Sequence, residues 1–309
     1  MRVIFLGTPD FGICALQSIM ERHQLVACVC QPDKVGARGK LEFCAVKKFA
    51  LQHNIPLYQF EKISRDGVQI LRELAPDIMV TAAYGQILSQ EVIDIPKHGI
   101  INIHGSLLPK LRGASPIQSA LLQGFTETGI TILNTVKAVD AGEIILQKSL
   151  KIQPYENCGS LFERLATLGA EAVVEALAQI ENGTAVYTKQ KEEDATFTQK
   201  ITAEQEQINW QNSAVDIVNL VRALSPQIGA HTTWNGGILK IFDLRIDEKK
   251  FDAKAGEVVE CGKKTLLVQC GDGVAVSIRL LQAANAKKMD IVSFLCGKKI
   301  PVGTVLGVQ

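Results

Sequence analysis

The feature that most constrains the fold is an alternation of short apolar runs with amphipathic stretches in the first third of the chain. Four runs are unbroken and rich in β-branched residues, as expected of strands buried on both faces. They are Val3 to Leu6, Leu25 to Cys30, Ile78 to Thr81 and Ile100 to Ile103. The stretches between them, at 11–20, 44–51 and 68–74, carry apolar residues at helical spacing. The pattern predicts an α/β fold with a Rossmann-like, doubly wound parallel sheet and right-handed connections.

A second domain of different character is expected to follow. The chain has 309 residues, more than one hydrophobic core usually serves. An amphipathic helix over 160–180, with Ser160 and Glu163 in a capping-box pattern, is expected near the end of the first domain. Beyond a polar stretch, a helix near 215–223 and four short strand-like runs separated by glycine turns predict a small OB-like β-barrel. The predicted division is a first domain at 1–188, a linker at 189–207 and a C-terminal domain at 208–309.

Charge and cysteine content exclude several classes of protein. The formal net charge of +1 argues against wholesale electrostatic binding to nucleic acid. The eight cysteines lie singly, without the spacing of a zinc site or the density of a disulfide scaffold, so we expect reduced thiols and no metal. The apolar start is too short for a signal peptide, and no later run is as long as a membrane span. We therefore expect a cytoplasmic protein that does not bind membranes.

The first two loops after strands differ in what they could bind. The loop at 7–12 lacks G-x-G-x-x-G spacing, and Pro9 removes a backbone donor, so NAD binding is not expected. It is either a tight turn or the edge of a substrate cleft. The loop at 31–40 is long and basic, and Arg38 and Lys40 lie among glycines. It is either a solvated excursion or a clamp that orders on a phosphate backbone.

A polar pair lies at the carboxyl end of the fourth strand. Asn102 and His104 are two residues apart, so they point to the same face, at the edge where open α/β sheets place their sites. Asp140 lies in a later turn before another strand, where an aspartate is as often structural as functional. The pattern alone therefore predicts a polar site at a strand end and does not identify its substrate.

Several segments around this pair resemble a known family. They are Gly7 to Phe11, Gln31 to Asp33, the basic loop at 36–40, Ala83 to Gly85, Asn102 to Pro109, Arg112 to Ile117 and Asp140 to Gly142. The Asn-x-His pattern with a later aspartate resembles the motif shared by all folate-dependent formyltransferases. The first turn, the basic loop and the second domain resemble the methionyl-tRNA formyltransferase family, and the resemblance covers the chain. It implies formyl transfer from 10-formyltetrahydrofolate to the amino group of methionyl-initiator tRNA, for translation initiation.

The resemblance also implies roles for individual residues. Asn102, His104 and Asp140 would be catalytic, without a metal. The first two would donate to the charge that builds on the formyl oxygen, each worth roughly 3 kcal/mol, and Asp140 would orient the imidazole and help to remove the proton of the amine through water. The implied folate-binding residues fall in two segments. They are Tyr84, Gly85, Ile87 and Leu88, then Ser106, Leu107, Leu108 and Pro109.

Basic residues in two regions are the candidates for tRNA binding. Arg38 and Lys40 lie in the basic loop, and Lys287 and Lys288 lie in the C-terminal region. Four lysine pairs there either form a basic stripe on a small barrel or simply lie in solvent-exposed turns. The pairs are Lys249–Lys250, Lys263–Lys264, Lys287–Lys288 and Lys298–Lys299. We expect a monomer that binds initiator tRNA and folate.

The sequence departs from the family pattern at three places. Residues 135–138 read Thr-Val-Lys-Ala where a Met-Asp pair and a glycine are usual, Leu111 replaces a common tryptophan, and 41–45 lacks the usual prolines. Two other functions stay open. The same site would serve glycinamide ribonucleotide or an amino sugar, although the second domain argues against both, or the chain would be a non-catalytic RNA-binding module.

Overall fold

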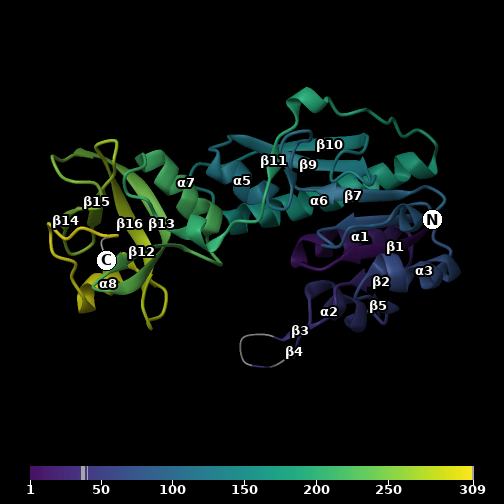
Figure 1. Cartoon of the computed structure of the whole chain (residues 1–309), viewed down its shortest axis with the longest axis horizontal. Coiled ribbons are helices and arrows are strands. Elements are labelled where there is room, and N and C mark those ends of the chain that lie inside the picture. Colours follow the sequence, from purple (N-terminus) through teal and green to yellow (C-terminus); the bar gives the residue numbers. More distant parts are fainter. Residues whose placement is uncertain (36–38, 40, 308–309) are drawn as a thin grey trace. The chain divides into compact units, whose positions relative to one another are not determined.

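The computed structural model describes residues 1–35, 39 and 41–307, and its contacts divide the chain into two compact units (Figure 1). The N-terminal unit comprises Met1–Pro116, Glu127–Lys151 and Phe162–Thr198. The C-terminal unit comprises Ile117–Thr126, Ile152–Leu161 and Gln199–Gln309. No helix in the part of the chain that is described is both long enough and apolar enough to cross a membrane.

A seven-stranded sheet forms the centre of the N-terminal unit, in the order β10-β9-β7-β6-β1-β2-β5. Its strands are β1 (Arg2–Gly7), β2 (Gln24–Cys30), β5 (Leu57–Gln59), β6 (Ile78–Ala82), β7 (Ile100–His104), β9 (Glu127–Asn134) and β10 (Ile144–Lys151). β5, β2, β1, β6 and β7 pair in parallel, whereas β9 and β10 are antiparallel to their neighbours. The predicted Rossmann-like parallel sheet is confirmed. The hairpin of β9 and β10 at the edge of the sheet was not predicted, because β10 alternates between more and less exposed positions and lacks a continuous apolar run.

Helices and short strands surround this sheet. The helices are α1 (Ile13–Arg22), α2 (Ala45–Gln52), α3 (Val68–Leu74), α4 (Gln90–Ile93) and α6 (Cys158–Glu181), with single turns η1 (Asp10–Gly12), η2 (Ile63–Gly67) and η3 (Glu192–Asp194). Two short pairs are β3 (Lys34–Val35) with β4 (Leu41–Glu42), and β8 (Arg112–Gly113) with β11 (Phe197–Thr198). On one face of the sheet, Ile4, Leu6 and Met79 pack in a core cluster with Leu71 of α3 and Val92 of α4. Burial on both faces explains the unbroken apolar runs.

Helix α6 starts two residues earlier than the predicted Ser160. The capping box expected at Ser160 and Glu163 is wrong, because the helix already begins at Cys158. The Oδ1 atom of Asn157 accepts the backbone N–H of Ser160 at 3.0 Å, the bond that an N-cap side chain makes to the third helical residue. Asn157 and Ser160 both suit caps, and periodicity does not fix a helix start to within two residues.

The C-terminal unit is built on an antiparallel sheet, in the order β12-β13-β16-β15-β14, with β17 paired to β16. Its elements are α5 (Pro116–Leu122), η4 (Ala203–Glu206), α7 (Ala214–Leu224), β12 (Ala230–Trp234), β13 (Gly237–Lys250), β14 (Val258–Cys261), β15 (Leu266–Gln269), β16 (Val274–Ala283), β17 (Met289–Asp290) and α8 (Ile291–Gly297). Ile217 and Val221 of α7 pack in one core with Ile241 and Ile278 of the sheet. The predicted antiparallel character is confirmed, and the Asn235–Gly236 turn has two positive φ angles, 51° and 69°, as tight hairpins require.

Candidate active site

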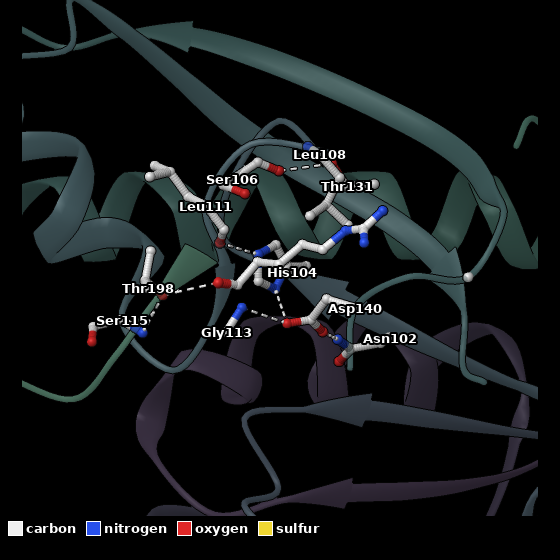
Figure 2. A network of polar contacts seen from close by, with 12 residues as sticks. Asn102, His104, Ser106, Leu108, Leu111, Gly113, Ser115, Thr131, Asp140 and Thr198 are labelled. Atoms are coloured by element: carbon white, nitrogen blue, oxygen red, sulfur yellow. Dashed lines mark hydrogen bonds and ion pairs between the residues drawn. The ribbon is translucent and has the colours of Figure 1, made fainter. Parts of the chain in front are cut away.

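Three irregular segments of the N-terminal unit meet at the carboxyl end of β7. They are residues 105–115, 135–143 and 188–198, irregular except for the short elements β8, η3 and β11, and Figure 2 shows side chains that converge there. β7 lies between β6 and β9, so Asn102 and His104 are flanked on both sides by paired backbone. The same-face relation predicted for these two residues brings both to one carboxylate, that of Asp140.

Asn102 is held in one orientation by contacts on both sides of its amide. The hydroxyl of Thr81, on β6, lies 2.8 Å from the Oδ1 atom of Asn102 and can donate to it. The Nδ2 atom donates to Oδ1 of Asp140 at 3.3 Å. An amide nitrogen carries two hydrogens, so this arrangement leaves Asn102 a second N–H to direct at another acceptor. Thr81 was not singled out from the sequence, although a polar residue ending a buried strand beside β7 was a usable signal.

His104 is buried, with 5% of its side chain exposed, and both ring nitrogens face oxygen atoms. Nε2 lies 3.0 Å from the carbonyl oxygen of Leu111. Because a carbonyl only accepts, Nε2 carries a hydrogen and donates it. Nδ1 lies 3.5 Å from Oδ2 of Asp140. Leu111 has a positive φ of 61°, and its backbone N–H donates to the Thr196 hydroxyl at 2.8 Å, so the carbonyl that orients the imidazole is itself fixed.

The carboxylate of Asp140 joins the three segments. Besides its contacts to Asn102 and His104, Oδ2 accepts the backbone N–H of Gly113 at 2.9 Å. Gly113 has a φ of 110°, and a Cβ atom there would lie 2.3 Å from the carbonyl oxygen of Thr198, so only glycine fits. Asp140 itself has a φ of 51°, a conformation that costs a non-glycine residue about 1 to 3 kcal/mol and persists only where its surroundings hold it.

The segment 188–198 packs along the site as part of the N-terminal unit. Ile144 and Thr188 form a β-bridge, and Phe197 and Thr198 pair in parallel with Arg112 and Gly113. Gln190 contacts both the Asp140 loop and Arg112. The polar composition from residue 189 onward predicts a linker and carries no signal for these contacts, because they join positions roughly 45 to 85 residues apart in the chain.

The eight residues implied to bind folate differ in accessibility. Ile87 is 80% exposed, whereas Tyr84 and Leu88 are buried, and burial raises the pKa of the Tyr84 hydroxyl. Ser106 and Leu108 are also buried. The Ser106 hydroxyl donates to the Lys110 carbonyl, and the Leu108 N–H donates to the Thr131 hydroxyl. Gly85 is exposed, and Leu107 and Pro109 are partly exposed. Buried members can therefore shape the site, while Gly85 and Ile87 can touch a ligand directly.

The residues predicted to bind tRNA are only partly described. Arg38 and Lys40 lie outside the described residues. Lys287 is exposed. Lys288 points its ammonium at the Pro226 carbonyl, 2.8 Å away, and over the Phe242 ring at 3.6 Å. Desolvation by burial, followed by the nearby Lys240, lowers the pKa of Lys288. Within the described part of the chain, no group of three or more His, Cys, Asp or Glu side chains could hold a metal ion.

This arrangement suits one kind of chemistry. An amide N–H, an imidazole and a carboxylate converge at a strand end, which is a set able to stabilise developing negative charge and to move a proton. The nearby Ser106 hydroxyl is bonded to a backbone carbonyl instead of a base, so it lacks the partner that activates a serine nucleophile. The geometry thus favours direct group transfer between two bound substrates.

Comparison with known proteins agrees with this geometry. The chain matches the family described as formyl transferase over residues 1–177, and the formyl transferase C-terminal domain over 200–299. It is 41% identical over 307 residues to a methionyl-tRNA formyltransferase of Agathobacter rectalis, covering 98% of this chain and 99% of that protein. It is 40% identical to a methionyl-tRNA formyltransferase of Staphylococcus aureus, covering 96% of each.

Solved structures share the fold at lower identity. A sugar 3N-formyl transferase crystallised with dTDP and 5-N-formyl-THF aligns with a TM-score of 0.69 at 20% identity, covering 93% of this chain and 99% of that one. A methionyl-tRNA formyltransferase from Clostridium thermocellum aligns with a TM-score of 0.55 at 16% identity, covering 81% of this chain and 94% of the other. These likenesses concern the fold.

Proposed function

Because this chain belongs to the formyl transferase family, we propose that it formylates the amino group of methionine on initiator tRNA, with 10-formyltetrahydrofolate as the donor. The product, N-formylmethionyl-tRNA, serves translation initiation. The observation that carries the proposal is the convergence of Asn102, His104 and Asp140 at the carboxyl end of β7. Sequence identity of 40 to 41% with methionyl-tRNA formyltransferases, over nearly the whole chain, also supports the proposal.

In this reaction a bond forms between the amino nitrogen and the formyl carbon, and the bond from that carbon to the folate nitrogen breaks. Negative charge grows on the formyl oxygen. The second N–H of Asn102 is free of Asp140 and is directed at that charge, as an oxyanion-hole donor is. For His104 to share the role of donor, one of its ring N–H groups must turn to the formyl oxygen from its present partner, the Leu111 carbonyl or Asp140. Asp140 orients the imidazole through the 3.5 Å contact and helps to pass the proton of the amine, through water, to the leaving nitrogen.

The residues proposed for the folate fit a flat, partly apolar ligand. Two large apolar side chains are exposed on the loops after β6 and β9, Ile87 with 80% and Val139 with 60% of its surface accessible. Covering apolar surface of this kind with a ring of the ligand is favourable, because it removes that surface from water. Gly85 has a φ of 84°, and its exposed backbone can approach a ligand closely. When bound, the folate supplies the formyl carbon. Ser106, Leu107, Leu108, Pro109, Tyr84 and Leu88 complete the proposed binding set.

The remaining parts of the proposal concern the tRNA. We assign phosphate contacts to Arg38 and Lys40 of the basic loop and to Lys287 and Lys288 of the C-terminal region. Catalysis is assigned to residues 1–188, against which 189–198 pack, and tRNA binding to an OB-like domain at 208–309, with 189–207 connecting the two. We propose that the protein acts as a monomer in the cytoplasm.

One assay tests the proposed acceptor. The chain is incubated with 10-formyltetrahydrofolate carrying a labelled formyl group and with methionyl-initiator tRNA, glycinamide ribonucleotide or an amino-sugar nucleotide. We expect label in the tRNA only. Label in either small acceptor and none in the tRNA would overturn the proposed function, and absence of label from all three would favour the RNA-binding module.

Substitutions test the proposed roles. We expect Asn102→Ala to lower kcat by about 100- to 1000-fold, as the loss of an oxyanion donor does. Asp140→Ala and His104→Ala should each cost about 100- to 10,000-fold, the range of general acid–base catalysis. All three variants should still bind tRNA in a filter-binding assay. Rates near that of the wild type in any variant would refute the role given to that residue.

A further inference from the structure

A saturated hydrogen-bond network contacts the backbone of the loop that carries Asp140. The side-chain amide of Gln190 donates from Nε2 to two backbone carbonyls of the Asp140 loop, those of Asp140 at 2.8 Å and Gly142 at 2.7 Å. Its Oε1 atom accepts from Nε and Nη2 of Arg112 at 3.0 and 2.9 Å. Both donors and both acceptor positions of the amide are therefore used.

Arg112 anchors this amide. Its side chain is 3% exposed, and a buried guanidinium needs a partner for its charge. Glu192 supplies one through a two-pronged contact, with Nη1 to Oε2 at 2.9 Å and Nη2 to Oε1 at 2.8 Å. The hydrogen bond from Arg112 lowers the pKa of Glu192. The geometry fixes the amide orientation of Gln190, because the arginine offers only donors and the two loop carbonyls only accept.

The carbonyls that Gln190 holds bracket a strained part of the loop. Asp140 has a φ of 51°, and Gly142 packs so closely that a Cβ atom there would lie 1.7 Å from the carbonyl oxygen of Asn134. Because the Gln190 side chain binds the carbonyls of both Asp140 and Gly142, it opposes relaxation of Asp140 out of its left-handed conformation. If the grip were lost, the carboxylate would be free to swing away from Asn102, His104 and Gly113.

We propose that Gln190, anchored by Arg112 and Glu192, is a positioning residue that fixes the backbone of Asp140 for formyl transfer. The expected effect on kcat rests on the proposed function, whereas the fixed backbone of the Asp140 loop rests on the hydrogen bonds described above. It gives the segment 188–198 a task in the reaction that requires no contact with either substrate. A misplacement of about 1 Å in a reacting group can cost a hundredfold in rate.

The decisive variant is Gln190→Glu, which keeps the size of the side chain and an acceptor for Arg112 but cannot donate to the two carbonyls when ionised. We expect kcat to fall about 10- to 100-fold while KM for tRNA and folate stays near that of the wild type. Gln190→Ala should behave similarly. In an Asp140→Ala background, Gln190→Glu should have no further effect on kcat, because it acts through Asp140.

Gln59→Glu is the matched control. Gln59 also donates from Nε2 to a backbone carbonyl, that of Gln31, and accepts from a cation, Lys47, but it lies on β5, at the far edge of the sheet order. Its kcat should stay within about twofold of the wild type.

Amide hydrogen exchange gives a readout that does not depend on activity. Peptides covering 135–143 should exchange faster in Gln190→Glu than in the wild type and in Gln59→Glu. Unchanged exchange and unchanged kcat would overturn the proposal, and so would a loss of kcat that persists in full without Asp140. A wild-type chain that formylates no tRNA would instead refute the proposed function, and exchange would still decide whether Gln190 holds the loop.

Discussion

The site region of the N-terminal unit and the hairpins of the C-terminal unit use left-handed backbone in opposite ways. Between 199 and 307, the non-glycine residues at positive φ are Asn235 and Asn285, a residue type that tolerates this conformation. Around β7 they include Leu111, a residue type that seldom adopts this conformation, and Asp140, which tolerates it better. Hydrogen bonds from distant segments hold these two in place, so left-handed backbone at the site is maintained by tertiary contacts.

Two glycines offer the largest test of this contrast. Gly113→Ala places a Cβ atom 2.3 Å from the Thr198 carbonyl oxygen, whereas Gly236→Ala meets nothing within 4 Å. We expect Gly113→Ala to displace the N–H that binds Asp140 and to lower kcat about a hundredfold. Gly236→Ala should cost only about 1 to 2 kcal/mol of unfolding free energy, from its left-handed φ, and leave kcat unchanged. Steady-state kinetics and urea unfolding check the pair, and equal effects on kcat would contradict the contrast.

Two buried threonines give a smaller test. Thr81 lies 2.8 Å from the Asn102 amide oxygen, and the Thr232 hydroxyl accepts the Trp210 indole N–H at 3.0 Å. Thr81→Val should lower kcat up to about tenfold, the equivalent of one neutral hydrogen bond, with little change in KM. Thr232→Val leaves a buried donor without its partner, so it should lose about 1 to 3 kcal/mol of stability but no kcat at a permissive temperature. If kcat fell in Thr232→Val but not in Thr81→Val, the role in the active site given to Thr81 would be refuted.

Two aspartates give the smallest test, through pH. Hydrogen bonds from Lys47 and Gln59 lower the pKa of Asp33, whereas desolvation raises the pKa of Asp243. A carboxyl group whose pKa is lower in the folded state stabilises the protein at pH values above its unfolded-state pKa, and this stabilisation is lost on acidification. A carboxyl group whose pKa is higher in the folded state destabilises the protein at high pH, and this cost disappears on acidification. The stability gap between the wild type and Asp33→Asn should therefore shrink as pH falls from 6 towards about 3. For Asp243→Asn, the wild type should gain relative to the variant over the same interval. Chemical denaturation at several pH values measures both, and parallel curves would refute the opposed shifts.

The same contrast explains how much the sequence could predict. The strands at 3–6 and 100–103 and the helix at 68–74 followed from periodicity, because local patterns determine which faces are buried. The Asn235–Gly236 hairpin followed from turn chemistry. Asn102 and His104 could be placed on one face by their spacing, but only resemblance connected them to Asp140, since nothing local specifies where a loop thirty-eight residues later will fold.

Other parts of the site carried no local signal. Gln190 lies in a polar stretch whose composition is typical of a linker, and its role depends on pairing with Arg112, seventy-eight residues earlier. The atypical stretch at 135–138 lies at the start of the loop that Gln190 grips further on, at 140 and 142. Long-range hydrogen bonds of this kind are set by tertiary packing, which neither propensity nor periodicity encodes.

The position of segment 188–198 in the chain has a consequence for how the protein is made. A ribosome releases the strands of the N-terminal unit first, and domains fold in that order during synthesis. Asp140 therefore leaves the ribosome fifty residues before Gln190, the residue that grips its backbone. A nascent chain can contain Asn102, His104 and Asp140 and still lack their final arrangement, so the protein would become competent only late in its own translation.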